Sequence, residues 1–150
     1  MPVFDDYQRY HGAALNIIAE QNAFSSINKY PGIESRATYL LNHNTALFIK
    51  HTTADGLTWR FTFSPDHQEI LDKLYSGMGN RTYLLLICKD WVCVLTYQEY
   101  AQCLDINHME DEWLEVRHLE GGGYRVRGAK GELQDVVPLN RFPNELIKPN

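Results

Sequence analysis

The spacing of apolar residues along the chain predicts three helices. The first follows a capping Asp5 or Asp6, because apolar residues then recur on one helical face. The second begins at Ser64-Pro65, where Ser is the cap and Pro suits the first turn. Thr96 and Glu99 form a capping box for the third. These helices are expected to end near Phe24, Gly77 and Leu104.

Short apolar runs bounded by turn residues predict the strands. Residues 42–44 and Asp55-Gly56 are typical of tight turns, since Asn, Asp and Gly tolerate left-handed backbone conformations. They would connect the first three strands as a meander. The next two strands are apolar on both faces, so they should lie centrally with cover on both sides. The expected strands span residues 38–41, 46–51, 57–63, 83–88, 91–95, 113–119 and 124–127.

Mixed helices and strands in this order predict an α/β (α+β mixed) fold with a central mixed β-sheet flanked by helices. A chain of 150 residues has the length of a single domain. No repeat or long linker divides it, so we expect one domain over residues 1–150. The glycine-rich residues 121–123 would join a C-terminal β-hairpin extension over about 112–130.

Composition narrows the classes of partner. The formal charge of −5 argues against a protein that coats nucleic acid, because phosphate neutralisation needs an excess of Lys and Arg. The first residues have no basic region and no apolar core, so they do not resemble a secretory signal. The longest apolar run, 83–88, is too short to span a bilayer. We therefore expect a cytoplasmic protein with no membrane partner.

No intact catalytic or metal-binding motif is present. The three cysteines form no Cys-x-x-Cys pair, which favours buried free thiols at Cys88, Cys93 and Cys103. The six histidines lack the spacing of a metal site, so no metal is predicted. His43 and His51 could still approach each other across a hairpin. The histidines are His11, His43, His51, His67, His108 and His118.

The order helix, strand hairpin, strand, helix, strand resembles the core of the PD-(D/E)XK nuclease-like superfamily, also called restriction endonuclease-like. Residues 46–53 and 59–63 carry the resemblance, which covers about 11–88. In that family a helical Glu, an Asp on one strand and a Glu-x-Lys on the next bind Mg²⁺ and activate water. The resemblance places Glu20 as the helical Glu and Lys50 as the Lys.

Two of the family's metal ligands are missing from this chain. Phe48 stands in the Glu position of Glu-x-Lys, and Glu34 is the nearest carboxylate to the Asp position. The resemblance therefore implies a degenerate site without a cofactor, in which Glu20 and Lys50 are vestigial. It also implies that Phe48 and Lys50 face the first helix. Phe48 would pack against Ile17 or Ile18 there, and Lys50 would meet Glu20 or Glu34.

Basic residues cluster on the predicted C-terminal hairpin. Strand alternation puts Arg125 and Arg127 on one face, opposite Val126, as a ladder that could bind phosphates. The alternative is a solvated strand face that Glu115 and Glu120 partly neutralise. The candidate binding residues are Arg117, Arg125, Arg127 and Lys130.

The leading hypothesis is a catalytically degenerate nuclease-like domain that acts as an interaction module and not as an enzyme. Its partner would be nucleic acid or another protein. One alternative is an active Mg²⁺-dependent DNA nuclease that uses non-standard carboxylates such as Glu20 and Glu34. A second alternative is a structural subunit without a ligand of its own. The sequence predicts no oligomeric state.

Overall fold

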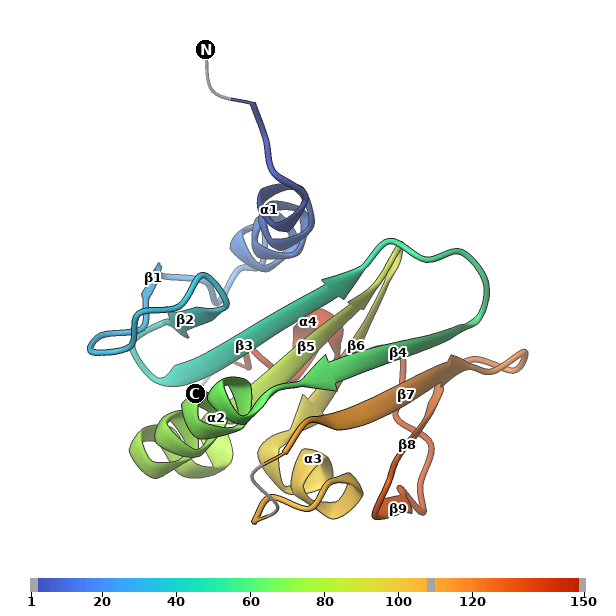
Figure 1. Cartoon of the computed structure of the whole chain (residues 1–150). Coiled ribbons are helices and arrows are strands. Elements are labelled where there is room, and N and C mark those ends of the chain that lie inside the picture. The colour runs from blue at the N-terminus through green and yellow to red at the C-terminus, as the bar shows by residue number, and fades with distance from the viewer. Residues whose placement is uncertain (1–2, 108–109, 149–150) are drawn as a thin grey trace.

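The computed structural model describes residues 3–107 and 110–148. This part of the chain folds into two β-sheets and four α-helices (Figure 1). His108 and Pro149 lie outside the described residues. The helices are α1 (Asp6–Ala19), α2 (Pro65–Met78), α3 (Tyr97–Cys103) and α4 (Arg141–Asn144), with a 3₁₀ turn η1 (Gly79–Arg81). None of the described helices is long and apolar enough to cross a bilayer.

The first sheet is mixed and has the strand order β1-β2-β3-β5-β6. β3 and β5 run parallel, and the other neighbours in this sheet are antiparallel. This sheet and the helices beside it confirm the predicted fold class. Its strands are β1 (Ile27–Lys29), β2 (Thr38–Leu41), β3 (Thr45–Thr52), β5 (Thr82–Cys88) and β6 (Trp91–Thr96).

The second sheet is antiparallel and has the order β4-β7-β8-β9. The predicted meander was wrong at its third strand, because β4 leaves the first sheet and pairs with β7. β4 is buried on one face only, whereas every residue of β5 is buried. β5 therefore suits the central place beside β3. The strands are β4 (Thr58–Phe63), β7 (Glu112–His118), β8 (Tyr124–Gly128) and β9 (Gly131–Glu132).

Capping and turn residues in the sequence correctly predicted several of the other helix and strand boundaries. Ser64 and Thr96 cap α2 and α3 in capping boxes, and β7 and β8 form the predicted hairpin. However, α1 ends at Ala19, earlier than Phe24, because the chain turns there toward β1. The chain after β9 contains the short α4.

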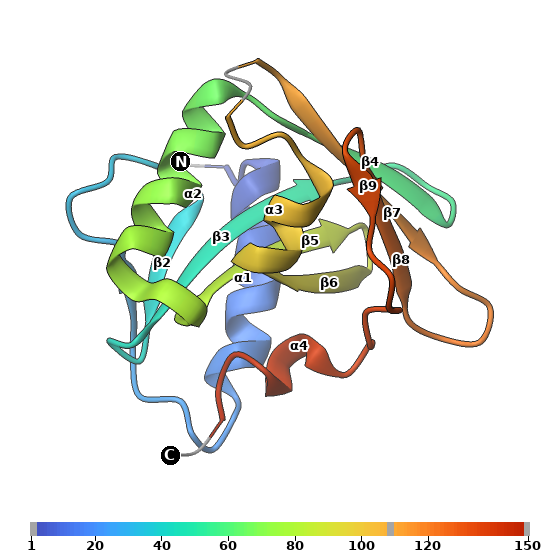
Figure 2. The same cartoon turned by 90° about the horizontal axis from the view of Figure 1, so that it is seen from below.

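Helices and the second sheet cover the two faces of the first sheet (Figure 2), and hydrophobic side chains fill both interfaces. On one face, α1 and the segment after α4 pack on Leu47, Ile49 and Leu85. On the other face, α2, α3 and the inner face of the second sheet enclose a larger core. Cys88, Cys93 and Cys103 are buried free thiols, as predicted, and burial raises the pKa of Cys103 to about 11.

Phe48 is buried, but the predicted face was wrong. Its ring centroid lies 6.4 Å from that of Phe63 and 5.9 Å from that of His67, on the side covered by α2. Ile18 packs with Leu47 and Ile49 on the opposite face. Phe48 and Lys50 do share one face of β3, as strand alternation requires. Alternation does not determine which helix covers which face.

Removing the Phe48 ring should therefore destabilise the protein strongly. Phe48→Ala is expected to lower the free energy of unfolding by about 3–5 kcal/mol, because the closed core cannot refill the volume of the ring. Phe4, whose side chain is 74% exposed, provides the matched control, and Phe4→Ala should change stability by less than about 0.5 kcal/mol. Urea unfolding followed by circular dichroism measures both. A similar small loss for both variants would contradict this core.

Candidate functional site

Glu20 and Lys50 do not form one site. Glu20 is exposed at the C-terminal end of α1, where Asn16 Nδ2 donates to Glu20 Oε1 at 2.9 Å. Lys50 lies on the opposite face of β3, beside α2, and its Nζ is 3.2 Å from His67 Nδ1. The expected pairing of Lys50 with Glu20 or Glu34 is not among the ion pairs of the described residues.

Lys50 lines a pocket beside the part of β3 that extends past the first residue of β2 and is therefore not paired with β2. The last pair between these strands is Thr38 and Phe48, yet β3 extends to Thr52. The pocket has a volume of about 310 Å³, and we call it the notch. Its lining contains histidine, arginine, lysine and aromatic side chains but no carboxylate. The lining residues are Tyr7, His11, Arg36, Ala37, Phe48, Ile49, Lys50, His51 and His67.

His11 is the most buried imidazole of the notch, with 4% of its surface exposed. Its Nδ1 is 3.0 Å from the hydroxyl of Tyr39, and the ring of His51 meets it edge-on at a centroid distance of 5.9 Å. Burial, reinforced by the charges of His51 and Lys29, lowers the pKa of His11 to about 4. His11 is therefore neutral at pH 7.

His67 connects the notch to the start of α2. The backbone N–H of Ser64 donates to His67 Nδ1 at 3.4 Å, and the backbone N–H of His67 donates to Ser64 Oγ at 3.2 Å. Lys50 donates to the same Nδ1. Since that nitrogen accepts both hydrogen bonds, it carries no proton, and the ring is the neutral tautomer with its proton on Nε2. Burial lowers the pKa of Lys50 to about 8.

The predicted approach of His43 and His51 was wrong. His43 lies in the exposed turn before β3, and His51 lies near the end of that strand, so the extended strand separates them by about 25 Å. The described residues contain no group of three or more His, Cys, Asp or Glu side chains that could hold a metal ion.

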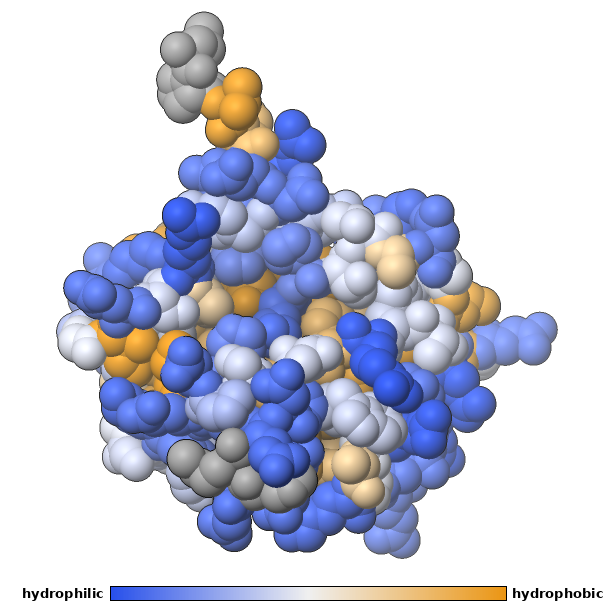
Figure 3. All heavy atoms as spheres, in the orientation of Figure 1, coloured by the Kyte–Doolittle hydropathy of each residue, from blue (hydrophilic) through white to orange (hydrophobic). Residues whose placement is uncertain are grey.

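Three of the four predicted binding residues lie together on the outer face of the second sheet. Arg117 is paired with Arg125 across β7 and β8, and Arg127 is paired with Glu115. Arg60 joins them from β4, opposite Glu115. Lys130 is separate, in the turn between β8 and β9. We call this surface the arginine face: Arg60, Trp113, Glu115, Arg117, Arg125 and Arg127. Strongly hydrophilic side chains gather over β4 and β7 in Figure 3.

Trp113 and Glu115 organise two of the arginines. The Arg60 guanidinium lies 4.2 Å from the centre of the Trp113 ring, and that of Arg127 lies 5.5 Å from it. Arg127 also donates to both carboxylate oxygens of Glu115, at 2.8 and 3.2 Å. These hydrogen bonds hold the pKa of Glu115 below its usual value. Both guanidinium groups are therefore held beside a partly exposed indole.

Arg117 and Arg125 are less constrained. Arg117 is exposed and forms no ion pair within the described ranges, while Arg125 Nη1 donates to the backbone carbonyl of Gln134 at 2.9 Å. Sequence reasoning missed Arg60 and Trp113. Arg60 alternates with buried aromatic residues, which indicates an outward side chain, but its position beside Glu115 depends on pairing between distant strands.

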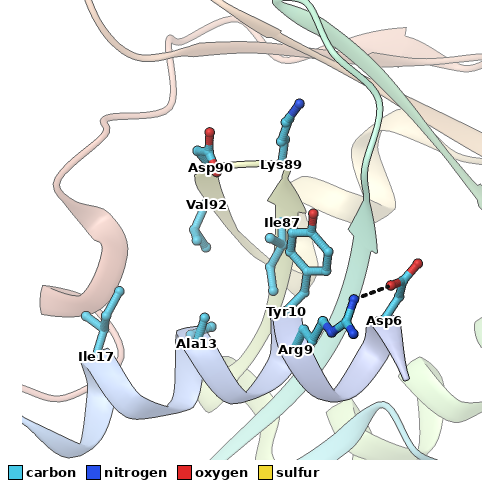
Figure 4. A pocket seen from close by; sticks show the side chains of 10 residues that line it. Asp6, Arg9, Tyr10, Ala13, Ile17, Ile87, Lys89, Asp90 and Val92 are labelled. Carbon is cyan, nitrogen blue, oxygen red and sulfur yellow. Dashed lines mark ion pairs between the residues drawn. The ribbon is translucent and has the colours of Figure 1, made fainter. Parts of the chain in front are cut away.

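A groove of about 370 Å³ lies between α1 and the turn that connects β5 to β6 (Figure 4). Its floor is apolar and includes Ile17, Ile87 and Val92. Its rim carries charges of both signs, among them the 3.7 Å ion pair of Arg9 with Asp6. A ligand of one charge is therefore not favoured at this groove.

The chain matches no family model, no curated protein and no solved structure with which it was compared. The resemblance to PD-(D/E)XK nucleases gains no support from these comparisons. The positions of Lys50 and α1 on opposite faces also remove the arrangement that the resemblance required. The geometry of the notch and of the arginine face is therefore the basis for assigning a function.

Replacing His11 should change how stability depends on pH. Histidine in the unfolded chain binds a proton near pH 6.5, whereas folded His11 does so only near pH 4. Stability should therefore fall as the pH drops from 6.5 to 4, by up to about 1.4 kcal/mol per pH unit for this one proton. In His11→Asn this contribution should disappear.

Urea unfolding at several pH values between 6.5 and 4 measures the effect. His43→Asn is the matched control, since His43 is exposed in a turn with φ of 58°, which Asn also adopts. This control should keep the wild-type slope. A wild-type slope in His11→Asn would show that His11 is protonated as readily in the folded state as in the unfolded chain.

Proposed function

We propose that this chain is a non-catalytic binding module that holds single-stranded nucleic acid against the arginine face. The observation that carries the proposal is the position of Arg60 and Arg127 at Trp113, with Arg117 and Arg125 further along the same exposed sheet face. The whole chain has a formal charge of −5, so this concentration of positive charge is local. A local basic surface supports phosphate binding even on an acidic protein.

The chemistry of the arginine face suits single strands better than a duplex. Unpaired bases can stack on an aromatic ring or on a guanidinium plane, and the outer face of an antiparallel sheet presents such groups side by side. Trp113 would stack with a base, and the arginines around it would contact the neighbouring phosphates. Threonines at positions 58 and 62 also point outward from β4, beside Arg117 and Trp113.

Glu115 is compatible with this role because it positions the arginines. It uses two N–H groups of Arg127 and leaves the other N–H groups of that guanidinium for a phosphate oxygen. Glu132 lies opposite Arg127 at the edge of the sheet and reduces the local positive charge further. We therefore expect moderate affinity with strong dependence on salt.

A protein partner with an acidic surface is the second candidate. Trp and Arg are enriched among the residues that contribute most to protein interfaces, and Trp113 lies between two arginines. The proposal includes no cleavage step, because Lys50 and α1 lie on opposite faces of the first sheet and Phe48 takes the place of a metal-binding Glu.

Substitutions on the arginine face should weaken binding of a fluorescent oligothymidylate. Trp113→Ala should lose about 1–3 kcal/mol of binding free energy, the range for one stacked base. Arg117→Ala should weaken binding and reduce the slope of log K against log salt by about 0.7, the value for one phosphate contact on a single strand. Fluorescence anisotropy at several salt concentrations measures both effects.

Arg9→Ala is the matched control, because Arg9 is an exposed arginine on α1, away from the second sheet. It should change neither the affinity nor the salt slope. Oligonucleotide binding that is equally weakened by Arg9→Ala and Arg117→Ala would show only a general effect of charge. The absence of binding at low salt would reject the proposal in favour of a protein partner.

A further inference from the structure

Lys50 differs in its partner from the three lysines that form ion pairs within the described residues. Lys73, Lys89 and Lys148 form ion pairs with carboxylates. Lys50 forms none; instead, its Nζ donates to the neutral Nδ1 of His67 at 3.2 Å and lies 5.2 Å from the centre of the Phe63 ring. The face of the Phe63 ring attracts a cation, but no carboxylate lines the notch to balance the charge of the partly buried ammonium group.

The environment of Lys50 favours the nucleophilic, uncharged amine. Burial lowers its pKa from the ordinary 10.5 to about 8. At pH 7.5 the uncharged fraction then exceeds that of an ordinary lysine by roughly two orders of magnitude. Burial and the charge of Lys50 also lower the pKa of His67, so its Nδ1 stays an unprotonated hydrogen-bond acceptor beside this amine.

The notch gives this amine a space for a small ligand. Its volume of about 310 Å³ lies at the lower end of the range for small-molecule sites. Arg36 also lines the notch, where its guanidinium lies 4.9 Å from the centre of the Tyr7 ring. Arg36 has no ion-pair partner among the residues that the structure describes, and no carboxylate lines the notch. A ligand with a negative group would meet a fixed positive charge there.

We propose that the notch binds a small aldehyde or ketone that carries a phosphate or carboxylate group, and that Lys50 forms an imine with its carbonyl carbon. The ammonium group of Lys50 first releases a proton to water. The amine nitrogen then bonds to the carbonyl carbon, the C=O π electrons move to oxygen, and both protons of the nitrogen pass to that oxygen. Loss of this oxygen as water leaves a C=N bond, so the step needs no oxidant or reductant.

The arginine face takes no part in this reaction. The notch lies on the first sheet, beside α1 and the start of α2, whereas the arginine face is the outer surface of the second sheet. The two proposals can therefore fail independently.

Pyridoxal 5′-phosphate, an aldehyde with a phosphate group, is a suitable probe. The full chain is incubated with an equimolar amount at pH 7.5, reduced with borohydride, digested and mapped by mass spectrometry. Lys50 should carry at least about ten times more label than any other lysine, given its larger uncharged fraction. Equal labelling of Lys50 and the exposed lysines would overturn the proposal.

Two variants test the assignment to Lys50. Lys50→Arg should remove the dominant label and leave the minor labels unchanged. Lys29→Arg is the matched control, because the Lys29 ammonium also lies 5.2 Å from an aromatic ring centre, that of Tyr39, but the residue is exposed. It should leave the label on Lys50 unchanged. A dominant label that persists in Lys50→Arg would place the reactive amine elsewhere.

Pyridoxal, which lacks the phosphate, tests the role of Arg36. The wild type should label Lys50 more with pyridoxal 5′-phosphate than with pyridoxal, and Arg36→Gln should remove this preference. Equal labelling of wild-type Lys50 by the two compounds would reject the anionic part of the ligand. A preference that is unchanged in Arg36→Gln would reject Arg36 as its partner.

Discussion

The parallel pairing of β3 with β5 is the constraint on which the rest of the structure depends. Every residue of β5 is buried, as are the first five of β3, so the centre of the first sheet needs hydrophobic cover on both faces. α1 and the segment after α4 cover one face, and α2, α3 and the second sheet cover the other. Phe48 and Phe63 contact each other within the second of these layers.

Both candidate surfaces follow from this arrangement. The second sheet uses its inner side chains to cover the first, so its outer face remains in solvent and carries the arginines and Trp113. β3 extends beyond the first residue of β2 to complete its pairing with β5, and the notch lies there, where β2 begins. The arginine face offers several positive charges beside an indole, whereas the notch offers a single amine in a small pocket. They favour different classes of ligand.

Features set by neighbouring residues could be predicted from the sequence. The caps at Ser64 and Thr96 and the hairpin of β7 with β8 depend on local hydrogen bonds and turn residues, and all three were found. Alternation also placed Arg125 and Arg127 on one face, and the burial of the cysteines was correct. These predictions needed no knowledge of which distant elements meet.

Features set by distant contacts could not be predicted. The pairing of β4 with β7 joins residues 49 to 59 positions apart in the chain, from Phe63 with Glu112 to Thr58 with Arg117, and no local pattern encodes it. For this reason Arg60 and Trp113 were missed. The face of the first sheet that α1 covers also depends on tertiary packing. The expectation that Phe48 and Lys50 face α1 was wrong for this reason. The environment of Lys50 depends on His67, which reaches it from α2.

Nuclear magnetic resonance of the ¹⁵N-labelled full chain, titrated with oligothymidylate at low salt, tests the central claim most directly. The account predicts the largest shift changes for amides of β4, β7 and β8 and for the indole N–H of Trp113. The indole N–H of Trp59, which is buried and donates to the carbonyl of Ala54 at 2.9 Å, should not move. Changes confined to the notch or to the groove beside α1, with Trp113 unaffected, would contradict the account.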